Sequence, residues 1–286
     1  MALVKVADIY HRAREGGYGV GGFCINDPGM AIAILQAAEE THSPVVTVIA
    51  QGSIRSVGTG YLEAMVKHGA SQVDIPVAIM LDHGTDLAIC LQCIMNGHSS
   101  VMFDGSHHPF EENMRLTRQV CELAHLLDVT VEGELGTIPH LWETSGEWAG
   151  EPVLVDPEIV PRFVKETGLD ALAIALGNAS GIPKEPPKLD FERLEKVAAS
   201  TDAYLVIHGG SGTPKKDVRR AIALGATAFR FASENYVAYL NAVEAARAQF
   251  PPGYPDTKVF YGLARDAAKK LISERMEHLG CAGKAW

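Results

Sequence analysis

The sequence predicts an α/β protein, a (β/α)8 TIM barrel with an additional C-terminal helix, and three observations support this prediction. Eight short apolar runs, rich in β-branched residues, recur along the 286 residues. Each run is nearly continuous rather than alternating, as is typical of parallel strands buried on both faces. Helical patterns separate the runs, so strand and helix alternate eight times. A doubly wound open sheet is the main alternative.

The eight runs place the strands in order along the chain. The first four occupy residues 21–27, 43–51, 76–84 and 99–106, and the last four occupy residues 130–136, 170–178, 203–211 and 226–233. No stretch between them has the composition of a linker that would divide the chain. We therefore expect residues 1–286 to form one barrel domain.

Three helix starts combine a capping side chain with a proline, the residue favoured at the first helical position. They are Asp27 before Pro28, Asp156 before Pro157 and Thr213 before Pro214. Gly168 and Gly225 follow the last turns of two helices, as C-terminal glycines do. The tail after Ser233 predicts the last barrel helix and then an added helix. Residues 138–152 lack periodicity, so we expect a mobile loop above the barrel mouth.

Composition excludes several classes of function. The chain has 25 Lys and Arg against 35 Asp and Glu, a net charge of -10, so it lacks the basic face that nucleic acids require. Its apolar runs are far shorter than the roughly 20 residues needed to span a bilayer. The N-terminal segment carries acidic residues and no apolar core, which is unlike a signal peptide. We expect a cytoplasmic protein that binds neither nucleic acid nor membrane.

The cysteines argue against a disulfide framework, because they are odd in number and scattered. They are Cys24, Cys90, Cys93, Cys121 and Cys281. Cys90 and Cys93 form a C-x-x-C within a helical pattern rather than at a helix start, where redox pairs lie. We interpret them as two small buried side chains.

Polar residues gather at the ends of all eight predicted strands, where a parallel barrel builds its active site. They are Asn26, Asp27, Gln51, Ser53, Asp82, His83, Asp104, Glu132, Glu134, Asn178, Ser180, His208, Ser211, Ser233 and Glu234. Among them, His83, Glu134 and His208 could converge on a divalent metal with an open coordination position. Asp82 precedes His83 on its strand and is expected to point differently, which would leave it able to act as a general base.

The segment HGGSGTPKKD, residues 208–217, predicts an anion site. Its glycines let backbone N–H groups approach an anion, Ser211 adds a donor, and a helix starts beside them. Loops after the seventh and eighth strands commonly hold phosphate in this fold, and Ser233, after the eighth strand, fits the same role. Lys184 lies in the preceding loop, GIPKEPPK. The alternative is a purely structural glycine turn. The pattern lacks the Walker lysine, so a nucleotide is not favoured.

From about Val6 to Lys284 the chain resembles the class II, metal-dependent ketose-bisphosphate aldolases, especially the fructose- and tagatose-bisphosphate branch. The resemblance rests on LDHG (81–84), SVMFDGSHHPFEENMRLTRQV (100–120), VEGELG (131–136), PKLDFERL (187–194), LVIHGGSG (205–212) and CAGKA (281–285). It implies cleavage of a ketose phosphate into a three-carbon ketone phosphate and an aldehyde, or the reverse condensation. Zinc would polarise the ketone oxygen and stabilise the enediolate.

The resemblance also implies roles for individual residues. Asp82 resembles the proton-transferring aspartate, His83 and His208 resemble metal ligands, and Glu134 resembles a carboxylate at the alternate metal position. Ser53 resembles a serine that contacts substrate. The residues that resemble the phosphate and monovalent-cation sites are Gly181, Lys184, Gly209, Ser211 and Ser233.

The chain departs from the family at four positions. Ser180 replaces the third zinc-binding histidine and would face the substrate instead. Arg230 replaces an asparagine that contacts the enediolate, and its planar charged fork suits a second anionic group such as carboxylate, phosphate or sulfonate. Cys24 stands where an asparagine is usual. Trp142 stands where an acidic proton donor is expected, which makes Glu143 the nearest catalytic substitute.

We therefore expect an aldolase-type carbon-carbon lyase that acts on a phosphorylated or otherwise anionic ketose by a metal-assisted enediolate mechanism. One alternative is an epimerase or isomerase that uses the same enolisation. Another is a non-catalytic paralogue that binds a sugar phosphate. The resemblance implies a homodimer or homotetramer. The added C-terminal helix and the apolar side chains of residues 236–243 are candidate contacts, unless they pack onto the barrel.

Overall fold

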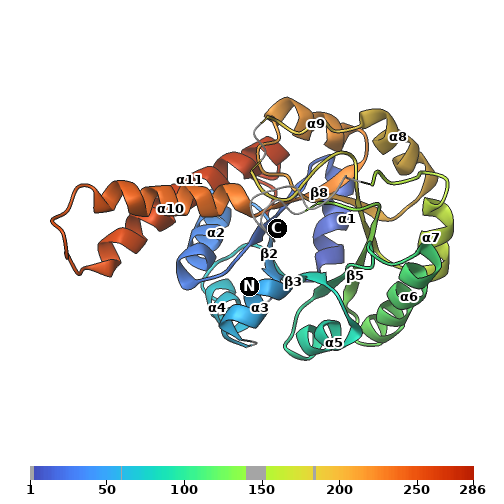
Figure 1. Cartoon of the computed structure of the whole chain (residues 1–286), viewed down its shortest axis with the longest axis horizontal. Coiled ribbons are helices and arrows are strands. Elements are labelled where there is room, and N and C mark those ends of the chain that lie inside the picture. Colours follow the sequence, from blue (N-terminus) through green and yellow to red (C-terminus); the bar gives the residue numbers. More distant parts are fainter. Residues whose placement is uncertain (1–2, 59, 140–152, 183–184) are drawn as a thin grey trace.

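The computed structural model describes residues 3–58, 60–139, 153–182 and 185–286. Eight parallel strands form a closed barrel in chain order (Figure 1). They are β1 (Val20–Cys24), β2 (Val45–Ala50), β3 (Val77–Gly84), β4 (Ser100–Phe103), β5 (Thr130–Leu135), β6 (Ala171–Ile174), β7 (Tyr204–Ile207) and β8 (Ala226–Phe231). β1 pairs with β8 from Val20 to Phe23, which closes the barrel. The predicted TIM barrel is confirmed, and the open sheet is wrong.

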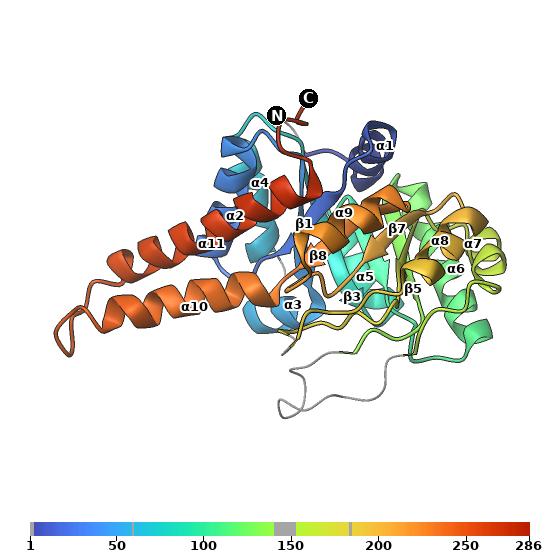
Figure 2. The same ribbon diagram turned by 90° about the horizontal axis from the view of Figure 1, so that it is seen from above.

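Helices cover the outside of the barrel (Figures 1 and 2). They are α2 (Pro28–Glu40), α3 (Gln51–Val57), α4 (Tyr61–Ala70), α5 (Leu87–Met95), α6 (Phe110–Leu126), α7 (Val160–Thr167), α8 (Phe191–Ser200) and α9 (Lys215–Ala223). Nearly every strand residue is buried, because helices cover one face of the sheet and the barrel interior fills the other. This double burial explains the continuous apolar runs in the sequence.

One of the three predicted helix starts is confirmed. The Asp27 carboxylate caps α2 and accepts hydrogen bonds from the backbone N–H of Gly29 at 2.7 Å and of Met30 at 3.1 Å. The start at Asp156 is wrong, because that carboxylate instead accepts from the backbone N–H of Glu158 within a turn. Helix α7 therefore begins three residues after Pro157, at Val160.

The predicted cap at Thr213 is also wrong. Helix α9 begins at Lys215, and its N-cap position is occupied by Pro214, which has no side-chain cap to offer. Gly168 does end α7 in the left-handed conformation, with φ of 72°, as predicted.

An additional helix, α1 (Val6–Gly16), precedes the barrel and was absent from the sequence prediction. Its start crosses the amino-terminal end of the barrel. The backbone N–H of Val4 donates to the carbonyl of Val77 at the start of β3, and that of Ala7 donates to Thr130 Oγ1 at the start of β5. Helix α1 thereby places the fully buried Tyr10 against the barrel interior.

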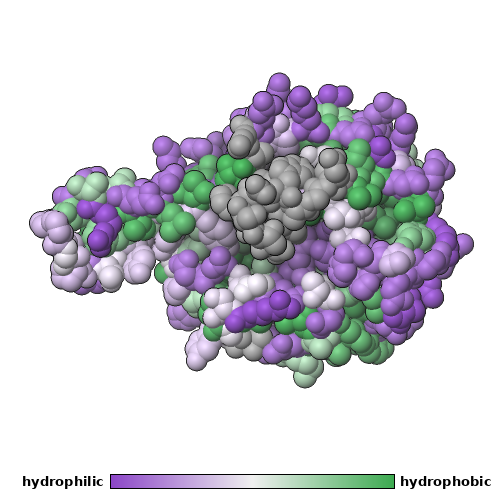
Figure 3. Space-filling model, viewed as in Figure 1, coloured by the Kyte–Doolittle hydropathy of each residue, from purple (hydrophilic) through white to green (hydrophobic). Residues whose placement is uncertain are grey.

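Two long helices follow β8, as the sequence predicts: α10 (Ser233–Arg247) and α11 (Thr257–Leu279). They run antiparallel and project beyond the barrel as a hairpin, while part of α11 packs on α2 (Figures 1 and 2). Apolar surface is visible along this hairpin among polar side chains (Figure 3). The predicted packing onto the barrel therefore accounts for only part of the hairpin.

The five cysteines are all free and buried. Burial raises the thiol pKa of Cys90 and of Cys93 to about 12, so both stay protonated, and their interpretation as small buried side chains is confirmed. Among the described helices, none combines the length and apolarity needed to cross a membrane. The predicted loop at 138–152 falls mostly outside the described residues.

Candidate active site at the barrel mouth

A cavity of about 850 Å³ opens at the carboxyl ends of the strands. Most of the site residues that the sequence predicts line this cavity. They are Ser53, Asp82, His83, Ser180, Gly181, His208, Gly209, Ser211, Arg230 and Ser233, together with Cys24. Lys184, Trp142 and Glu143 lie outside the described residues. The polar strand ends therefore do meet in one place, as expected for a parallel barrel.

Asp82 and His83 lie next to each other at the end of β3, and both contribute to the same cluster. This corrects the expectation that they would point differently. The pairing of β3 with β4 shifts register between Leu81 and Gly84, and His83 has a φ of 48°. These two irregularities break the strand alternation, so ligand atoms of consecutive residues lie within 4.8 Å of each other and of His208.

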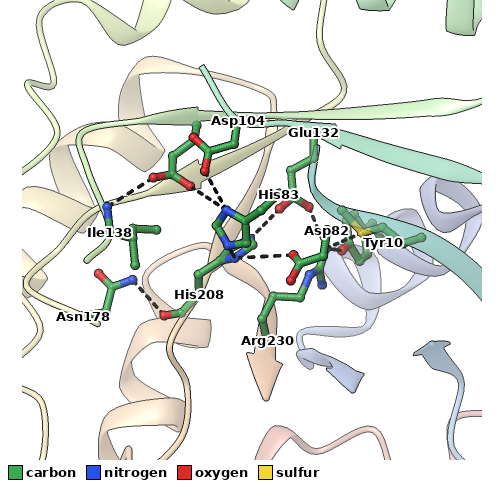
Figure 4. Close-up of polar contacts among 11 residues, drawn as sticks. Tyr10, Asp82, His83, Asp104, Glu132, Ile138, Asn178, His208 and Arg230 are labelled. Atoms are coloured by element: carbon green, nitrogen blue, oxygen red, sulfur yellow. Dashed lines mark hydrogen bonds and ion pairs between the residues drawn. The ribbon is translucent and has the colours of Figure 1, made fainter. Parts of the chain in front are cut away.

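The two histidines face each other with a defined geometry (Figure 4). His83 Nε2 lies 3.2 Å from His208 Nδ1. The remote nitrogens are both engaged by carboxylates, His83 Nδ1 by Asp104 at 2.7 Å and His208 Nε2 by Glu132 at 2.7 Å. When the remote nitrogens donate to those carboxylates, the facing nitrogens present lone pairs to the same point. Carboxylates behind imidazoles are the usual second shell of a protein metal site.

The separation of the facing nitrogens fits a metal ion. Tetrahedral zinc with bonds of about 2.0–2.1 Å to nitrogen places two ligand atoms roughly 3.3–3.4 Å apart. Asp82 Oδ1 lies 3.8 Å from His208 Nδ1 and completes a three-residue group. These donors suit a divalent ion with an open position, so the side chains present fit the metal that the resemblance implies.

Glu134 joins a different group from the one predicted. Its Oε2 lies 3.8 Å from His83 Nδ1, so it groups with His83 and Asp104. Its other oxygen accepts from the backbone N–H of Ile138 at 3.2 Å. His83 belongs to both groups. Among the described residues, Glu134 therefore lies near His83 but is not grouped with His208.

Electrostatics favour a positive charge in this cluster. Burial lowers the pKa of His83, but the charges of Asp82, Asp104 and Glu134 and the hydrogen bond to Asp104 outweigh burial and raise that pKa to about 10. Burial raises the pKa of Asp104, but its contacts with His83 and Ser106 dominate and hold it well below its usual range. Burial raises the pKa of Glu134 well above normal. The carboxylates around His83 thus favour a positive charge at this position, which either a proton on the imidazole or a metal ion bound to the neutral ring would supply.

Sequence reasoning placed Glu132 at a strand end but gave it no role. The structure places its second oxygen on Arg230, whose Nη2 donates at 2.6 Å, and the same Nη2 donates to the hydroxyl of Tyr10 at 2.7 Å (Figure 4). The alternation in VEGELG does contain a signal, because Glu132 and Glu134 are two residues apart and share the inner face of the barrel. Tyr10 carries no such signal.

The loops after β6 and β7 are packed together at the predicted anion site. Gly209 has a φ of 60°, and a Cβ there would lie 2.1 Å from the carbonyl oxygen of Ala179. The Asn178 side chain donates to the carbonyl of His208 at 2.8 Å. Ser233 is the first residue of α10, so the positive end of a 15-residue helix meets the cavity beside these loops.

Comparison with known proteins places this geometry in a family. The model of the class-II fructose-bisphosphate aldolase family matches residues 4–284. A fructose-bisphosphate aldolase from Geobacillus stearothermophilus is 40% identical over 289 residues, which cover 100% of this chain and 99% of that protein. A probable fructose-bisphosphate aldolase from Bacillus subtilis (strain 168) is 39% identical and is covered completely, as is this chain.

Solved structures agree in fold. The crystal structure of the YdjI aldolase from Escherichia coli K12 matches with a TM-score of 0.88 and 28% identity over 99% of this chain and 100% of that one. A match over nearly the whole length, together with relatives near 40% identity, shows that the chain belongs to the class II fructose-bisphosphate aldolase family.

Proposed function

We propose that this protein is a metal-dependent aldolase that cleaves and forms a carbon-carbon bond of a phosphorylated ketose. Family membership and relatives named as fructose-bisphosphate aldolases support the reaction class. The observation that carries the proposal is the pair of facing histidines, 3.2 Å apart, each backed by a carboxylate. An epimerase would need the same site, but the relatives favour cleavage.

His83 and His208 would hold the metal through the facing nitrogens, and Glu134 offers a carboxylate on the other side of His83. Imidazole ligands suit zinc and other divalent transition-metal ions. A bound ion would act as a Lewis acid on the ketone oxygen of the substrate. A monovalent cation near the phosphate remains a prediction from the resemblance.

We assign the proton at the enediolate carbon to Asp82. In cleavage, the hydroxyl beside the scissile bond loses its proton, that bond breaks, and its electron pair moves toward the ketone to give an enediolate and an aldehyde. The enediolate carbon then takes a proton, and the burial of Asp82 beside both histidines supports Asp82 as the group that delivers it. Glu143 as the acid or base at the hydroxyl remains a prediction.

The phosphate would lie over the loops after β6, β7 and β8. Gly181, Gly209, Ser211 and Ser233 line this part of the cavity, and the first residue of α10 brings the positive end of a helix to it. Ser53 and Ser180 also line the cavity, where their hydroxyls can contact substrate. Lys184 remains a predicted phosphate ligand.

Product analysis tests this function. Purified protein loaded with Zn²⁺ would be incubated with fructose- and tagatose-bisphosphate, and the products followed by NMR. We expect aldehyde and ketone phosphate, loss of activity with a chelator, and recovery with Zn²⁺. An isomerised ketose without aldehyde, or substrate binding without turnover, would overturn cleavage. Turnover unaffected by chelator, with no tightly bound divalent metal in elemental analysis, would overturn the metal.

The predicted partners follow from this function. A small sugar phosphate is the expected ligand. The resemblance implies a homodimer or homotetramer, which sedimentation can test. The cytoplasmic location stays a prediction from the sequence.

A further inference from the structure

We propose that Arg230 is a positioning residue for the metal site, which acts through Glu132 on His208 and does not touch the substrate. The proposal rests on the proposed function for the presence of a metal. It differs from the sequence expectation that Arg230 contacts a second anionic group, and the test below separates the two roles.

The hydrogen bonds of the Arg230 guanidinium are made to side chains of the barrel interior. Its Nη2 donates to Glu132 Oε2 at 2.6 Å, to the hydroxyl of Tyr10 at 2.7 Å and lies 2.8 Å from Met80 Sδ. Tyr10 comes from α1, which crosses the opposite end of the barrel. The guanidinium therefore extends inward, toward the barrel interior.

The burial of Arg230 supports the same conclusion. Its side chain is 3% exposed, and its Nε and Nη1 are buried without a hydrogen-bond partner among the described residues. Gly22 on β1 makes room for the guanidinium, because a Cβ there would lie 2.7 Å from both Cδ and Nη1 of Arg230. Arg230 lines the cavity, but these two nitrogens are buried, so a substrate anion could reach them only if the surrounding side chains moved.

Glu132 links Arg230 to the metal site. Arg230 fixes Oε2, and the other oxygen, Oε1, then lies 2.7 Å from His208 Nε2. This hydrogen bond keeps the proton on Nε2 and turns Nδ1 toward His83, where the metal would bind. Glu132 is fully buried, so without Arg230 its charge would lack its closest compensating partner. Arg230 thus holds the carboxylate that orients one metal ligand.

Metal affinity measures this role directly. Co²⁺ would be titrated into metal-free wild type and Arg230→Met, with affinity and visible absorption as readouts. We expect affinity to fall by about 10- to 100-fold, the usual effect of losing an outer-shell partner, with a changed absorption spectrum. Arg230→Lys should keep part of the affinity, because it keeps the charge but not the planar fork. Arg162→Met, at a surface ion pair with Glu111, is the matched control and should bind Co²⁺ like wild type.

A double variant guards against loss of folding. In Glu132→Gln with Arg230→Met, the neutral amide oxygen can accept from His208 Nε2 and leaves no buried charge unpaired. We expect this variant to recover at least part of the Co²⁺ affinity lost in Arg230→Met, with a cooperative thermal melt. Failure to recover any affinity in a folded double variant would count against the link through Glu132.

Two further outcomes separate the alternatives. Wild-type Co²⁺ affinity and spectrum in Arg230→Met would overturn the proposal, and a raised KM for the phosphorylated ketose would then assign Arg230 to a substrate anion. If Co²⁺ affinity depends on Arg230 as expected but the wild type cleaves no ketose phosphate, the aldolase function fails and the positioning role stands.

Discussion

The two histidines of the site are held in different ways. His83 adopts a left-handed backbone conformation, with φ of 48°, that non-glycine residues rarely occupy. Such conformations persist where surrounding contacts compensate the strain, and here the ring is bound to Asp104 at 2.7 Å. His208 follows β7 directly, and its carbonyl is held by the Asn178 side chain. Strain at one residue thus lets β3 and β7, which are not paired with each other in the barrel, aim imidazoles at one point.

Replacement of Asp82 by asparagine tests its proton-transfer role. The amide has the same shape but cannot accept the proton, so we expect kcat to fall by about 10²- to 10⁴-fold. Exchange of the enediolate hydrogen with solvent deuterium, followed by NMR, should fall in parallel. Unchanged exchange in a variant that melts like wild type would show that another group moves this proton.

Ser180→His tests the departure at the third ligand position. Ser180 lines the cavity, and the carbonyl of neighbouring Ala179 approaches Gly209, the residue after His208. A third imidazole here would add a strong nitrogen donor, so we expect Zn²⁺ affinity to rise at least about tenfold in competition with a chelator. Ser180→Asn is the control and should change the affinity little. Equal affinities in both variants would place position 180 outside the coordination sphere.

The sequence identifies most individual site residues but not their mutual arrangement. His83, His208 and Asp104 stand out because they are polar groups at the ends of apolar strands. The shared cluster of Asp82 and His83 depends on the register shift in β3, which no sequence period reveals. The role of Glu132 depends on Arg230, 98 residues away, and could not be predicted without the closed barrel.

At the level of elements, the strands are more predictable than the helix starts. Each strand is buried on both faces of the sheet, so its sequence is a continuous apolar run. A helix start, in contrast, depends on one carboxylate, which can instead cap a turn, as Asp156 does. Helix α1 does carry a local signal, because its buried residues Val6, Ile9, Tyr10 and Ala13 recur at helical spacing, but the contacts that anchor it to the barrel, such as the bond from Ala7 to Thr130, are distant in sequence. Long-range packing, which has no local signal, positions the helix that carries Tyr10.

Gly209→Ala tests how the loops after β6 and β7 are joined. A Cβ at this position would lie 2.1 Å from the Ala179 carbonyl oxygen, and the positive φ adds strain. We expect a loss of about 1–3 kcal/mol of stability and weaker phosphate binding, measured by thermal melts and by KM. Gly52→Ala is the control, because nothing lies within 4 Å of its Cβ position and it sits in α3. Equal melting of the two variants would contradict the close packing.

Glu63 links α4 to the segment before β4 and predicts a pH effect on stability. It accepts from the backbone N–H of Gly60 at 2.8 Å and contacts His98 Nε2 at 3.1 Å. Burial acts to raise the pKa of Glu63, but these hydrogen bonds outweigh it and lower that pKa below 4.5. Its stabilisation is therefore complete above the unfolded pKa of about 4.3 and is lost as pH falls through the folded value.

Glu63→Gln should reduce the loss of stability that the wild type shows at acid pH. We expect the variant to lose about 1–3 kcal/mol at pH 7, and the difference from wild type to shrink below about pH 4. Urea unfolding from pH 3 to 7 measures both effects. The exposed Glu192→Gln, which removes an ion pair with Lys196 on the surface of α8, should change stability by less than about 1 kcal/mol. A constant difference between Glu63→Gln and wild type at every pH would contradict the linkage.

For the whole molecule, net charge says little about the ligand. The chain carries a net charge of -10, yet Ser211 and the first residue of α10 line its mouth, where we propose that an anion binds, beside a group of side chains that could hold a cation. Overall charge governs solubility and long-range steering, whereas local groups determine which ligand binds.

A chain of hydrogen bonds runs from Tyr10 through Arg230 and Glu132 to His208 and connects the two ends of the barrel.

The α10–α11 hairpin predicts self-association, because it projects from the barrel (Figure 2) and exposes apolar surface (Figure 3), with apolar side chains on both helices. Val237, Leu240, Tyr261 and Leu263 are each 39–57% exposed. A second copy that buries this surface would account for it, since large exposed apolar surfaces mark interfaces. We expect sedimentation to give a dimer or tetramer, and Leu240→Asp to reduce it toward monomer. Leu126→Asp, at a leucine at the end of α6 that is more exposed than Leu240, should leave assembly intact, which ties dissociation to the hairpin rather than to added charge.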